Sequence, residues 1–292
     1  MSKQPDILCI GAVLWDIIGR ATAHMRVGSD VPGRITRLPG GVAMNIAMAL
    51  KAYGMSPAIL TAIGQDDEGA ELIRACTRLG IDAGHVYRSE DLPTDRYMAV
   101  EGGNGLIAAV ADAHSLEAAG DKILRPLGAA LKGWDGLVAL DGNLTVALLE
   151  QIAHAPEFEQ TDLRVAPASP GKAERLIPYL SHPKATIYVN LEEANLLLHR
   201  TIDNSAEAAS ALTDHGLYRA VVTDGPNPAT VATKAGVITL TPPEVLVTRV
   251  TGAGDTFMAA HIASEAQGAD GQAALKRALE AAATYISGES YQ

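Results

Sequence analysis

Cysteine is scarce in this sequence. Among 292 residues there are only two, Cys9 and Cys76. Two isolated cysteines make neither a disulfide framework nor a metal cluster. We expect both to be small core residues of a protein in the reducing cytoplasm. The eight histidines are scattered without ligand spacing, so we expect no histidine-based metal site.

Positive charge is also limited. The chain has 23 Lys and Arg against 34 Asp and Glu, a net charge of −11, and no block of consecutive basic residues. Binding to a nucleic-acid backbone depends on clustered positive charge, so we expect no nucleic-acid partner. An anionic small molecule stays possible as a substrate, because a local pocket can oppose the overall charge.

Long apolar runs are missing as well. No segment has the uninterrupted apolar length of a membrane span, and the first residues lack the apolar stretch and cleavage site of a signal peptide. We therefore expect no membrane partner. The composition, 48% hydrophobic and 20% charged, is that of an ordinary globular protein.

Short apolar runs alternate with amphipathic or Ala-rich stretches along most of the chain. Such alternation predicts an α/β fold, with a doubly wound, mostly parallel sheet between two layers of helices. The strand-like runs lie near 6–13, 57–63, 136–140, 163–166, 186–190 and 219–223. The helix-like stretches lie near 42–53, 66–79, 145–154, 172–180, 192–199, 205–214, 254–267 and 271–287.

Two segments, about 17–37 and 93–112, interrupt this alternation with strand-like sequence and no helix between. In the second, apolar residues flank a turn at Glu101–Gly105 that contains Asn-Gly, a pair that suits a tight hairpin. We interpret these segments as a small β-sheet lid over the site. With no linker or repeat in view, we treat residues 1–292 as one domain.

The strongest chemical motif is Gly252-Ala253-Gly254-Asp255, which precedes an Ala-rich helix. Glycines let a phosphate approach the backbone, and the amides of a helix N-terminus attract anions. Asp255 beside such a cradle is suited to accept a proton from an attacking hydroxyl. The motif lacks the Lys-Ser/Thr of a P-loop. The alternative is a simple turn in which Asp255 is the N-cap residue of the helix.

A second motif lies far upstream, where Gly40-Gly41 precedes a helix that contains Asn45. The two glycines let a ligand lie against the backbone. The Asn45 amide offers both a donor and an acceptor, which suits a sugar diol. The alternative is a loop before a core helix, with Asn45 as a buried polar residue.

Together, in this order and about two hundred residues apart, the two motifs resemble the two signatures of the ribokinase-like (PfkB) carbohydrate kinases. Further landmarks follow the family order. The resemblance implies that Asp16 binds sugar hydroxyls and that Asn190 and Glu193 lie near the ATP phosphates, where Glu193 organises Mg²⁺ through water. It also implies that Thr223 and Gly225 line the nucleotide, and that the glycines at 252 and 254 form the anion hole. A homodimer through the lids is a further implication.

Within the family, the lid hairpin, the Pro167–Ala173 segment and Val250-Thr251 before the glycine motif resemble pseudouridine kinases. We therefore expect an ATP-dependent kinase that makes pseudouridine 5′-phosphate. The alternatives are a kinase for ribose, fructose or adenosine, and a non-catalytic protein that senses a nucleoside or sugar. A nicotinamide oxidoreductase is disfavoured, because residues 11–16 lack Gly-x-Gly-x-x-Gly after the first strand.

Three features depart from the family pattern. Pro226-Asn227-Pro228 follows Thr223-Asp224-Gly225 where a second Gly is common, so we expect a stiffer loop on the nucleotide side. Leu14 stands where many members have an Asn. Arg249 stands where cation-activated members have an Asp that helps to bind K⁺, so K⁺ dependence is doubtful for this chain. We interpret Arg249 either as a positive charge in place of the ion or as a solvent-facing residue.

Overall fold

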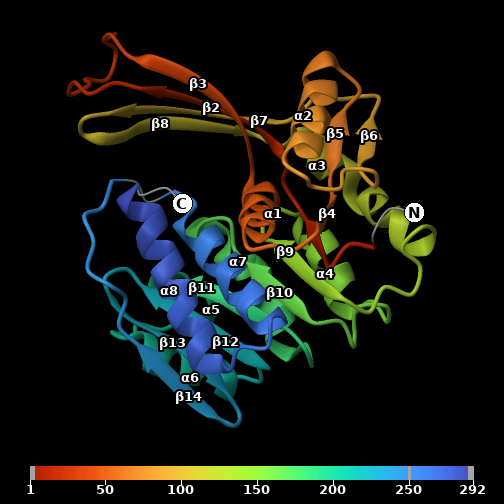
Figure 1. Ribbon diagram of the computed structural model, residues 1–292, viewed down its shortest axis with the longest axis vertical. Coiled ribbons are helices and arrows are strands. Elements are labelled where there is room, and N and C mark those ends of the chain that lie inside the picture. Colours follow the sequence, from red (N-terminus) through yellow and green to blue (C-terminus); the bar gives the residue numbers. More distant parts are fainter. Residues whose placement is uncertain (1–3, 249–250, 289–292) are drawn as a thin grey trace.

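An eight-stranded sheet forms the centre of the computed structural model, which describes residues 4–248 and 251–288 (Figure 1). Across the sheet the order is β14 (Gly236–Leu240), β13 (Asn227–Thr233), β12 (Arg219–Asp224), β11 (Thr186–Asn190), β10 (Leu163–Ala166), β9 (Leu137–Asp141), β1 (Ile7–Ile10) and β4 (Pro57–Leu60). From β12 to β4 all neighbouring strands are parallel, whereas the β12–β13 and β13–β14 pairs are antiparallel. The predicted α/β fold with a mostly parallel sheet is confirmed.

Helices cover both faces of this sheet, so its strands are apolar on both sides. In β1, Ile7 and Cys9 pack into one core while Leu8 and Ile10 pack into the other. The first core includes α1 (Val42–Ala52), α2 (Asp67–Arg78), α7 (Ala253–Ala266) and α8 (Gly271–Ser287). The second includes α3 (His114–Ala119), α4 (Val146–His154), α5 (Leu191–Leu198), α6 (Ser205–Asp214) and the 3₁₀ segments η1 (Gly120–Gly128) and η2 (Pro170–Ser181).

A smaller sheet stands apart from the central one, over the ends of α7 and α8 in Figure 1. Its order is β3 (Arg34–Gly40), β2 (Leu14–Arg20), β7 (Arg96–Gly102) and β8 (Gly105–Asp112). These strands occupy the two predicted lid segments and extend beyond the first at both ends. The hairpin between β7 and β8 turns at Gly103-Asn104, one residue before the predicted Asn-Gly pair, and Gly105, with a φ of 91°, follows the turn.

Some predicted elements differ from those observed. The run 57–63 divides into β4 and β5 (Ala62–Gly64), and β5 pairs with β6 (Tyr87–Ser89) in a third, two-stranded sheet. The helix predicted over 172–180 is the 3₁₀ segment η2, which starts at Pro170 and contains Pro178. Strands β13 and β14 were not predicted, because Pro226 and Pro228 suggested a loop. Pro228 lies where the pairing register of β13 shifts, a position that tolerates a missing N–H donor.

The two cysteines are free and buried, as predicted for core residues. The cytoplasmic location inferred from their scarcity stays a prediction. In the described ranges we find no helix with the length and apolar character that a bilayer-spanning segment needs.

Candidate active site

The N-terminus of α7 lies at the centre of the candidate site. Gly252 is the residue before the helix, and its φ of 87° lies in the left-handed region that favours glycine. Ala253, Gly254 and Asp255 form the first turn, in which backbone amides have no partner within the helix. Asp255 is therefore inside the helix, and the alternative that it is the N-cap residue is wrong.

Asp255 contacts the second motif directly. The Nδ2 atom of Asn45, on α1, donates a hydrogen bond of 2.9 Å to Oδ2 of Asp255, across 210 residues of sequence. Burial raises the pKa of Asp255 to about 7. The Asn45 bond opposes this rise, whereas the negative charges of Asp141 and Asp16 add to it. A carboxylate with a pKa near neutrality is suited to exchange protons at physiological pH.

Asp16 lies at the base of the small sheet, on β2, beside the glycines that precede α1. A Cβ atom on Gly40 would stand 1.9 Å from Oδ2 of Asp16, so only glycine allows the two strands to meet here. Gly41 follows as the N-cap residue of α1. Burial raises the pKa of Asp16 to about 6, and within the described residues its carboxylate accepts no hydrogen bond. Its oxygens are therefore available to a ligand.

Asp141, which sequence reasoning missed, is the third carboxylate of this group. It ends β9, is fully buried, and accepts hydrogen bonds of 2.8 Å from the backbone amides of Ala12 and Asn143. Lys172 donates to the side-chain oxygen of Asn143. The sequence did contain a signal, since an acidic residue and Gly-Asn directly follow the apolar run at 136–140. Carboxyl ends of parallel strands are where such folds place ligands.

The residues predicted for the nucleotide side lie at the same edge, at the ends of β11 and β12. Asn190 and Thr223 are neighbours in the register of these strands, and Gly225 lies in the turn that follows β12. Asn190 and Glu193 form a reciprocal capping box for α5, with two hydrogen bonds of 2.8 Å. Within the described part of the chain, no hydrogen bond or ion pair joins these residues to Asp255 or Asp16.

Glu193 has limited capacity for a metal ion. One carboxylate oxygen already accepts the amide of Asn190, and burial raises the pKa of Glu193 to about 7. Residues 4–248 and 251–288 contain no cluster of three His, Cys, Asp or Glu side chains that could hold a metal. Such a donor set fits Mg²⁺ that is held mainly by phosphates and water with one carboxylate nearby. Arg249, the basis of the doubt about K⁺, lies outside the described residues.

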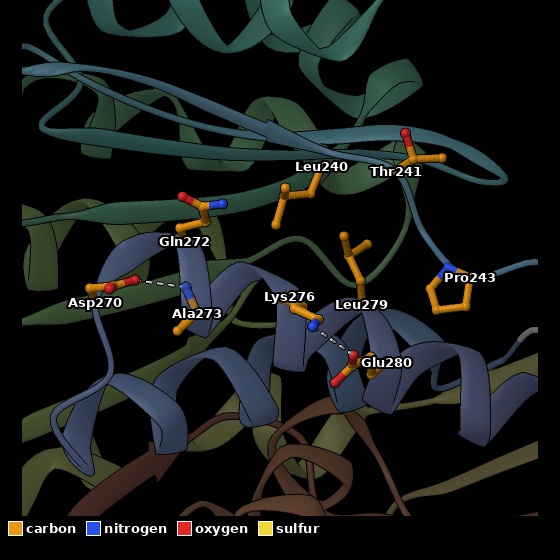
Figure 2. A pocket seen from close by; sticks show the side chains of 9 residues that line it. All are labelled: Leu240, Thr241, Pro243, Asp270, Gln272, Ala273, Lys276, Leu279 and Glu280. Atoms are coloured by element: carbon orange, nitrogen blue, oxygen red, sulfur yellow. Dashed lines mark hydrogen bonds and ion pairs between the residues drawn. The ribbon is translucent and has the colours of Figure 1, made fainter.

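A hollow of about 420 Å³ lies between α8 and the edge strand β14 (Figure 2). Leu240, Pro243 and Leu279 supply apolar surface, and Lys276 and Glu280 form an ion pair at its side. The volume is in the range of small-molecule sites. Sequence reasoning did not find this hollow, because it depends on how α8 packs against β14.

Comparison with known proteins agrees with this geometry. The family description "pfkB family carbohydrate kinase" matches residues 4–292. The chain is 29% identical to a guanosine-inosine kinase of Exiguobacterium acetylicum, over 96% of this chain and 94% of that protein. It is 26% identical to the pseudouridine kinase of Escherichia coli, over 89% and 83% of the two chains.

The fold matches that of solved ribokinases. A structure of Arabidopsis thaliana ribokinase complexed with ribose and ATP superposes with a TM-score of 0.75 at 18% identity, covering 97% of this chain and 93% of the other. Because the family match spans nearly the whole chain, the activity class follows: a sugar or nucleoside kinase that uses ATP and a hydroxyl acceptor. This chain belongs to the pfkB family of carbohydrate kinases.

Proposed function

We propose that this kinase phosphorylates a nucleoside, with pseudouridine as its substrate and pseudouridine 5′-phosphate as its product. The lid hairpin, the Pro167–Ala173 segment and the residues before the glycine motif support the pseudouridine branch. Two nucleoside kinases among the relatives support a nucleoside over a free sugar. The guanosine-inosine kinase has similar identity to the chain, so a purine nucleoside is the second candidate.

The observation that supports the chemistry best is the pairing of Asp255 with Asn45 at the N-terminus of α7. Asp255 would accept the proton of the attacking hydroxyl as the new P–O bond forms. Its raised pKa makes it a stronger base than an ordinary aspartate. The Asn45 amide holds the carboxylate in place and leaves the other oxygen, Oδ1, for the substrate.

The backbone amides of the Gly252–Asp255 turn would stabilise negative charge on the transferring phosphoryl group. Gly254 supports this role in a specific way. A Cβ atom at Gly254 would meet nothing within 4 Å, so the protein's own packing does not require glycine there. Glycine inside a helix lowers stability by about 1 kcal/mol relative to alanine. Close approach of a ligand accounts for its presence.

The acceptor would lie under the small sheet, with its hydroxyls bound by Asp16, Asn45 and the backbone at Gly40-Gly41. Asp16 offers unpaired oxygens, and two hydroxyls of a ribose ring can share one carboxylate. The small sheet would act as a lid whose closure excludes water, a competing acceptor.

ATP would run from the α7 N-terminus past Asn190, Thr223 and Gly225, with its base in the hollow between α8 and β14 (Figure 2). Mg²⁺ bound to the phosphates near Glu193 would neutralise part of their charge. We expect Ala273→Phe, which fills the hollow, to raise the KM for ATP about tenfold while the KM for the nucleoside stays constant. Ala273→Ser is the matched control, and equal changes in both KM values would contradict this placement of the base.

The lid would also bind a second copy of the chain. Side chains alternate across a strand, so Ile17 lies on the face opposite Asp16. Across the four strands this outer face aligns Arg37, Ile17, Met98 and Val110 in one row, and Ile35, Gly19, Val100 and Ala108 in the next. Ile35, Met98 and Val110 are 77%, 51% and 62% exposed. Apart from Arg37, which pairs with Glu71 of α2, the residues of these two rows are apolar or glycine. An exposed apolar face of this kind marks an interaction surface, and the same face on a second copy is complementary to it.

Sedimentation velocity tests the dimer. We expect a dimer for the wild type and a monomer for Met98→Glu and Val110→Glu. Val237→Glu, at a 49% exposed valine on the edge strand β14, is the matched control and should leave the dimer intact. A monomeric wild type would contradict the proposal.

The function itself is tested by ATP consumption with Mg²⁺ against pseudouridine, uridine, guanosine, inosine, adenosine, ribose and fructose. Turnover on pseudouridine, little on uridine, and loss in Asp255→Asn are the expected results. Turnover on guanosine or a simple sugar would support the kinase activity but show that pseudouridine is not the substrate. Tight binding of a nucleoside without turnover of any acceptor would favour the sensing protein.

A further inference from the structure

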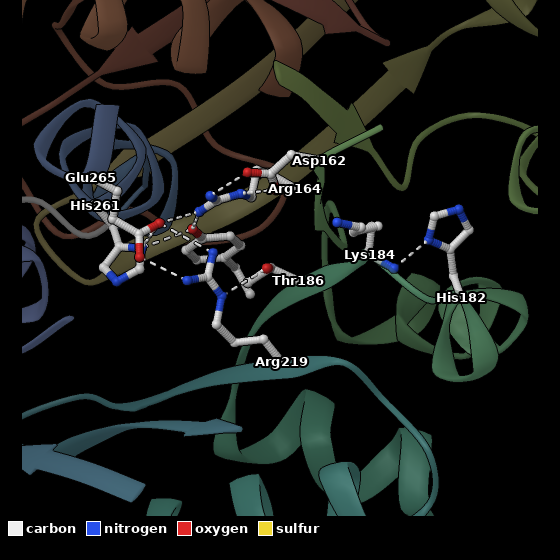
Figure 3. Close-up of polar contacts among 9 residues, drawn as sticks. Asp162, Arg164, His182, Lys184, Thr186, Arg219, His261 and Glu265 are labelled. Atoms are coloured by element: carbon white, nitrogen blue, oxygen red, sulfur yellow. Dashed lines mark hydrogen bonds and ion pairs between the residues drawn. The ribbon is translucent and has the colours of Figure 1, made fainter. Parts of the chain in front are cut away.

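A second cluster of charged side chains lies at the opposite, amino-terminal edge of the central sheet (Figure 3). Arg164, Thr186 and Arg219 are register neighbours on β10, β11 and β12, so their side chains form one row on one face. Arg164 is 5% exposed and pairs through two hydrogen bonds, of 2.6 and 2.7 Å, with Asp162. Arg219 donates to the hydroxyl of Thr186 at 2.9 Å.

Helix α7, which begins with the glycine motif, contributes the partner of both arginines. Glu265, near the end of α7, accepts a hydrogen bond of 2.6 Å from Nη1 of Arg164. It also accepts hydrogen bonds of 2.7 and 3.1 Å from the two Nη atoms of Arg219. His261 lies one turn before Glu265, and Phe257 stacks on His261 one turn earlier. These three side chains therefore form a stripe that faces the sheet.

Tyr188 of β11 links the two halves of this cluster. Its hydroxyl accepts a 3.0 Å hydrogen bond from Arg164 and lies 2.9 Å from Nδ1 of His261. Burial lowers the pKa of His261 to about 4, so the ring is neutral at physiological pH and its hydrogen bond with the tyrosine joins two uncharged groups. The cluster is thus a continuous hydrogen-bonded network from three strands to one helix.

We propose that Glu265 is a positioning residue for catalysis: through Arg164 and Arg219 it fixes the axial and rotational position of α7 on the sheet, and so the position of Asp255. This inference rests on the role of Asp255 in the proposed function. Ten residues separate the two carboxylates, about 15 Å along a helix. A buried helix of this length transmits a shift at one end to the other.

The surface that α7 buries beside Met258 and Ile262 consists largely of alanines, which gives a reason why such a fixed point is needed. Ala259, Ala260 and Ala263 belong to the same core as Ala278 and Ala281 of α8. Small side chains form shallow ridges and grooves, so packing alone specifies the register of such helices weakly. The bidentate geometry of arginine and carboxylate specifies distance and direction together. The network therefore specifies the position of α7, which the alanine contacts specify only weakly.

The first test is Glu265→Gln, compared with Glu265→Asp, which keeps the charge but shortens the side chain. We expect kcat to fall about tenfold to hundredfold in Glu265→Gln, the effect of misplacing a catalytic group by about 1 Å. The KM values for ATP and nucleoside should change less than threefold, since the binding residues lie mainly on other elements. Glu265→Asp should recover part of kcat.

A matched control distinguishes the effect of a shift of α7 from the effect of a general loss of stability. Tyr179→Phe removes a buried hydrogen bond of 2.9 Å to Leu149, in the core on the other face of the sheet. It should lower stability and leave kcat unchanged. An equal loss of kcat in Tyr179→Phe, or wild-type kcat in Glu265→Gln, would overturn the proposal.

Hydrogen–deuterium exchange keeps the test independent of the assigned function. In Glu265→Gln, amides 256–260 at the start of α7 should exchange at least tenfold faster, whereas those of α5 should not change. If the wild-type enzyme phosphorylates nothing on the substrate panel, the proposed function fails while this readout still decides the role of Glu265. Unchanged exchange in α7 would overturn the positioning role even if the kinase is confirmed.

Discussion

The two ends of α7 lie in opposite electrostatic environments. At its N-terminus, burial and neighbouring carboxylates raise the pKa of Asp255 to about 7. Near its C-terminus, Arg164 and Arg219 outweigh burial and lower the pKa of Glu265 to about 2. The negative charge of Asp255 is thus unfavourable in the folded protein, whereas the negative charge of Glu265 is compensated by two arginines.

We infer that the difference separates a site suited to chemistry from one that stabilises structure. A carboxylate surrounded by cations and hydrogen bonds is a weak base, whereas one crowded by like charges accepts a proton readily. The unfavourable charge of Asp255 at the carboxyl edge of the sheet lowers the stability of the fold. The ion pairs of Glu265 at the amino edge offset part of this loss. Mutations at the two ends should therefore change activity and stability in different combinations.

The largest effect should follow from Asp255→Asn. We expect turnover to fall about 10²–10⁴-fold, the usual contribution of a positioned base, while ATP still binds. Steady-state kinetics and calorimetry with ATP measure the two parts. Asp214→Asn, an exposed change at the end of α6, serves as the control. Near-normal turnover in Asp255→Asn would remove this residue from the role of base.

At the other end, Arg164→Met should mainly reduce stability. Loss of one partner leaves Asp162 and Glu265 with less compensation, and breaking a buried ion pair costs about 3–5 kcal/mol. Urea denaturation at pH 7 measures the free energy of unfolding. A loss below about 1 kcal/mol would show that the network is dispensable for stability.

The pH dependence of stability should differ between the two carboxylates. The folded pKa of Asp255 lies above its unfolded value of about 3.9, so its buried charge lowers stability as pH rises from about 4 to 7. Asp255→Asn should therefore be more stable than the wild type at pH 8 by about 1–3 kcal/mol, and nearly equal to it at pH 4. Glu265 has the opposite sign: its stabilisation is present above about pH 4.5 and is lost as pH falls toward 2.

Thermal unfolding at several pH values measures this difference. Wild type and Asp255→Asn share every other titrating group, so their difference reports Asp255 together with its interaction with Asp16 and Asp141. Equal stability of the two proteins at pH 8 would show that the charge of Asp255 is not costly.

The smallest change in stability, with a clear change in activity, should come from Gly254→Ala. The new methyl group meets open space, and alanine favours the helix, so stability should rise by about 0.5–1 kcal/mol. The methyl group would occupy the volume of the phosphate, and kcat/KM for ATP should fall about tenfold or more. Unfolding and kinetic measurements on one preparation test both parts. Retained kcat/KM would contradict an anion site at this turn.

Local sequence was sufficient to select much of the candidate site. The glycines at 40, 41, 252 and 254, and the acids that follow strands, are short-range patterns whose backbone requirements are visible in the sequence. Asn45 and Asp255 were both selected in this way. Their contact depends on α1 and α7 packing side by side, which neither pattern contains.

By itself, the sequence determined the strand–helix alternation, and with it the α/β class, the mostly parallel sheet and the edge at which such folds place ligands. Hydrophobic periodicity and turn residues depend on a few neighbouring positions, so they can be recognised in the sequence without knowledge of the fold. Only the tertiary structure decided the convergence of Asp16, Asp141 and Asp255, the hollow beside α8, and the pairing of Glu265 with two distant arginines. Charge and burial depend on neighbours brought from far along the chain, and these set the pKa values that distinguish Asp255 from Glu265.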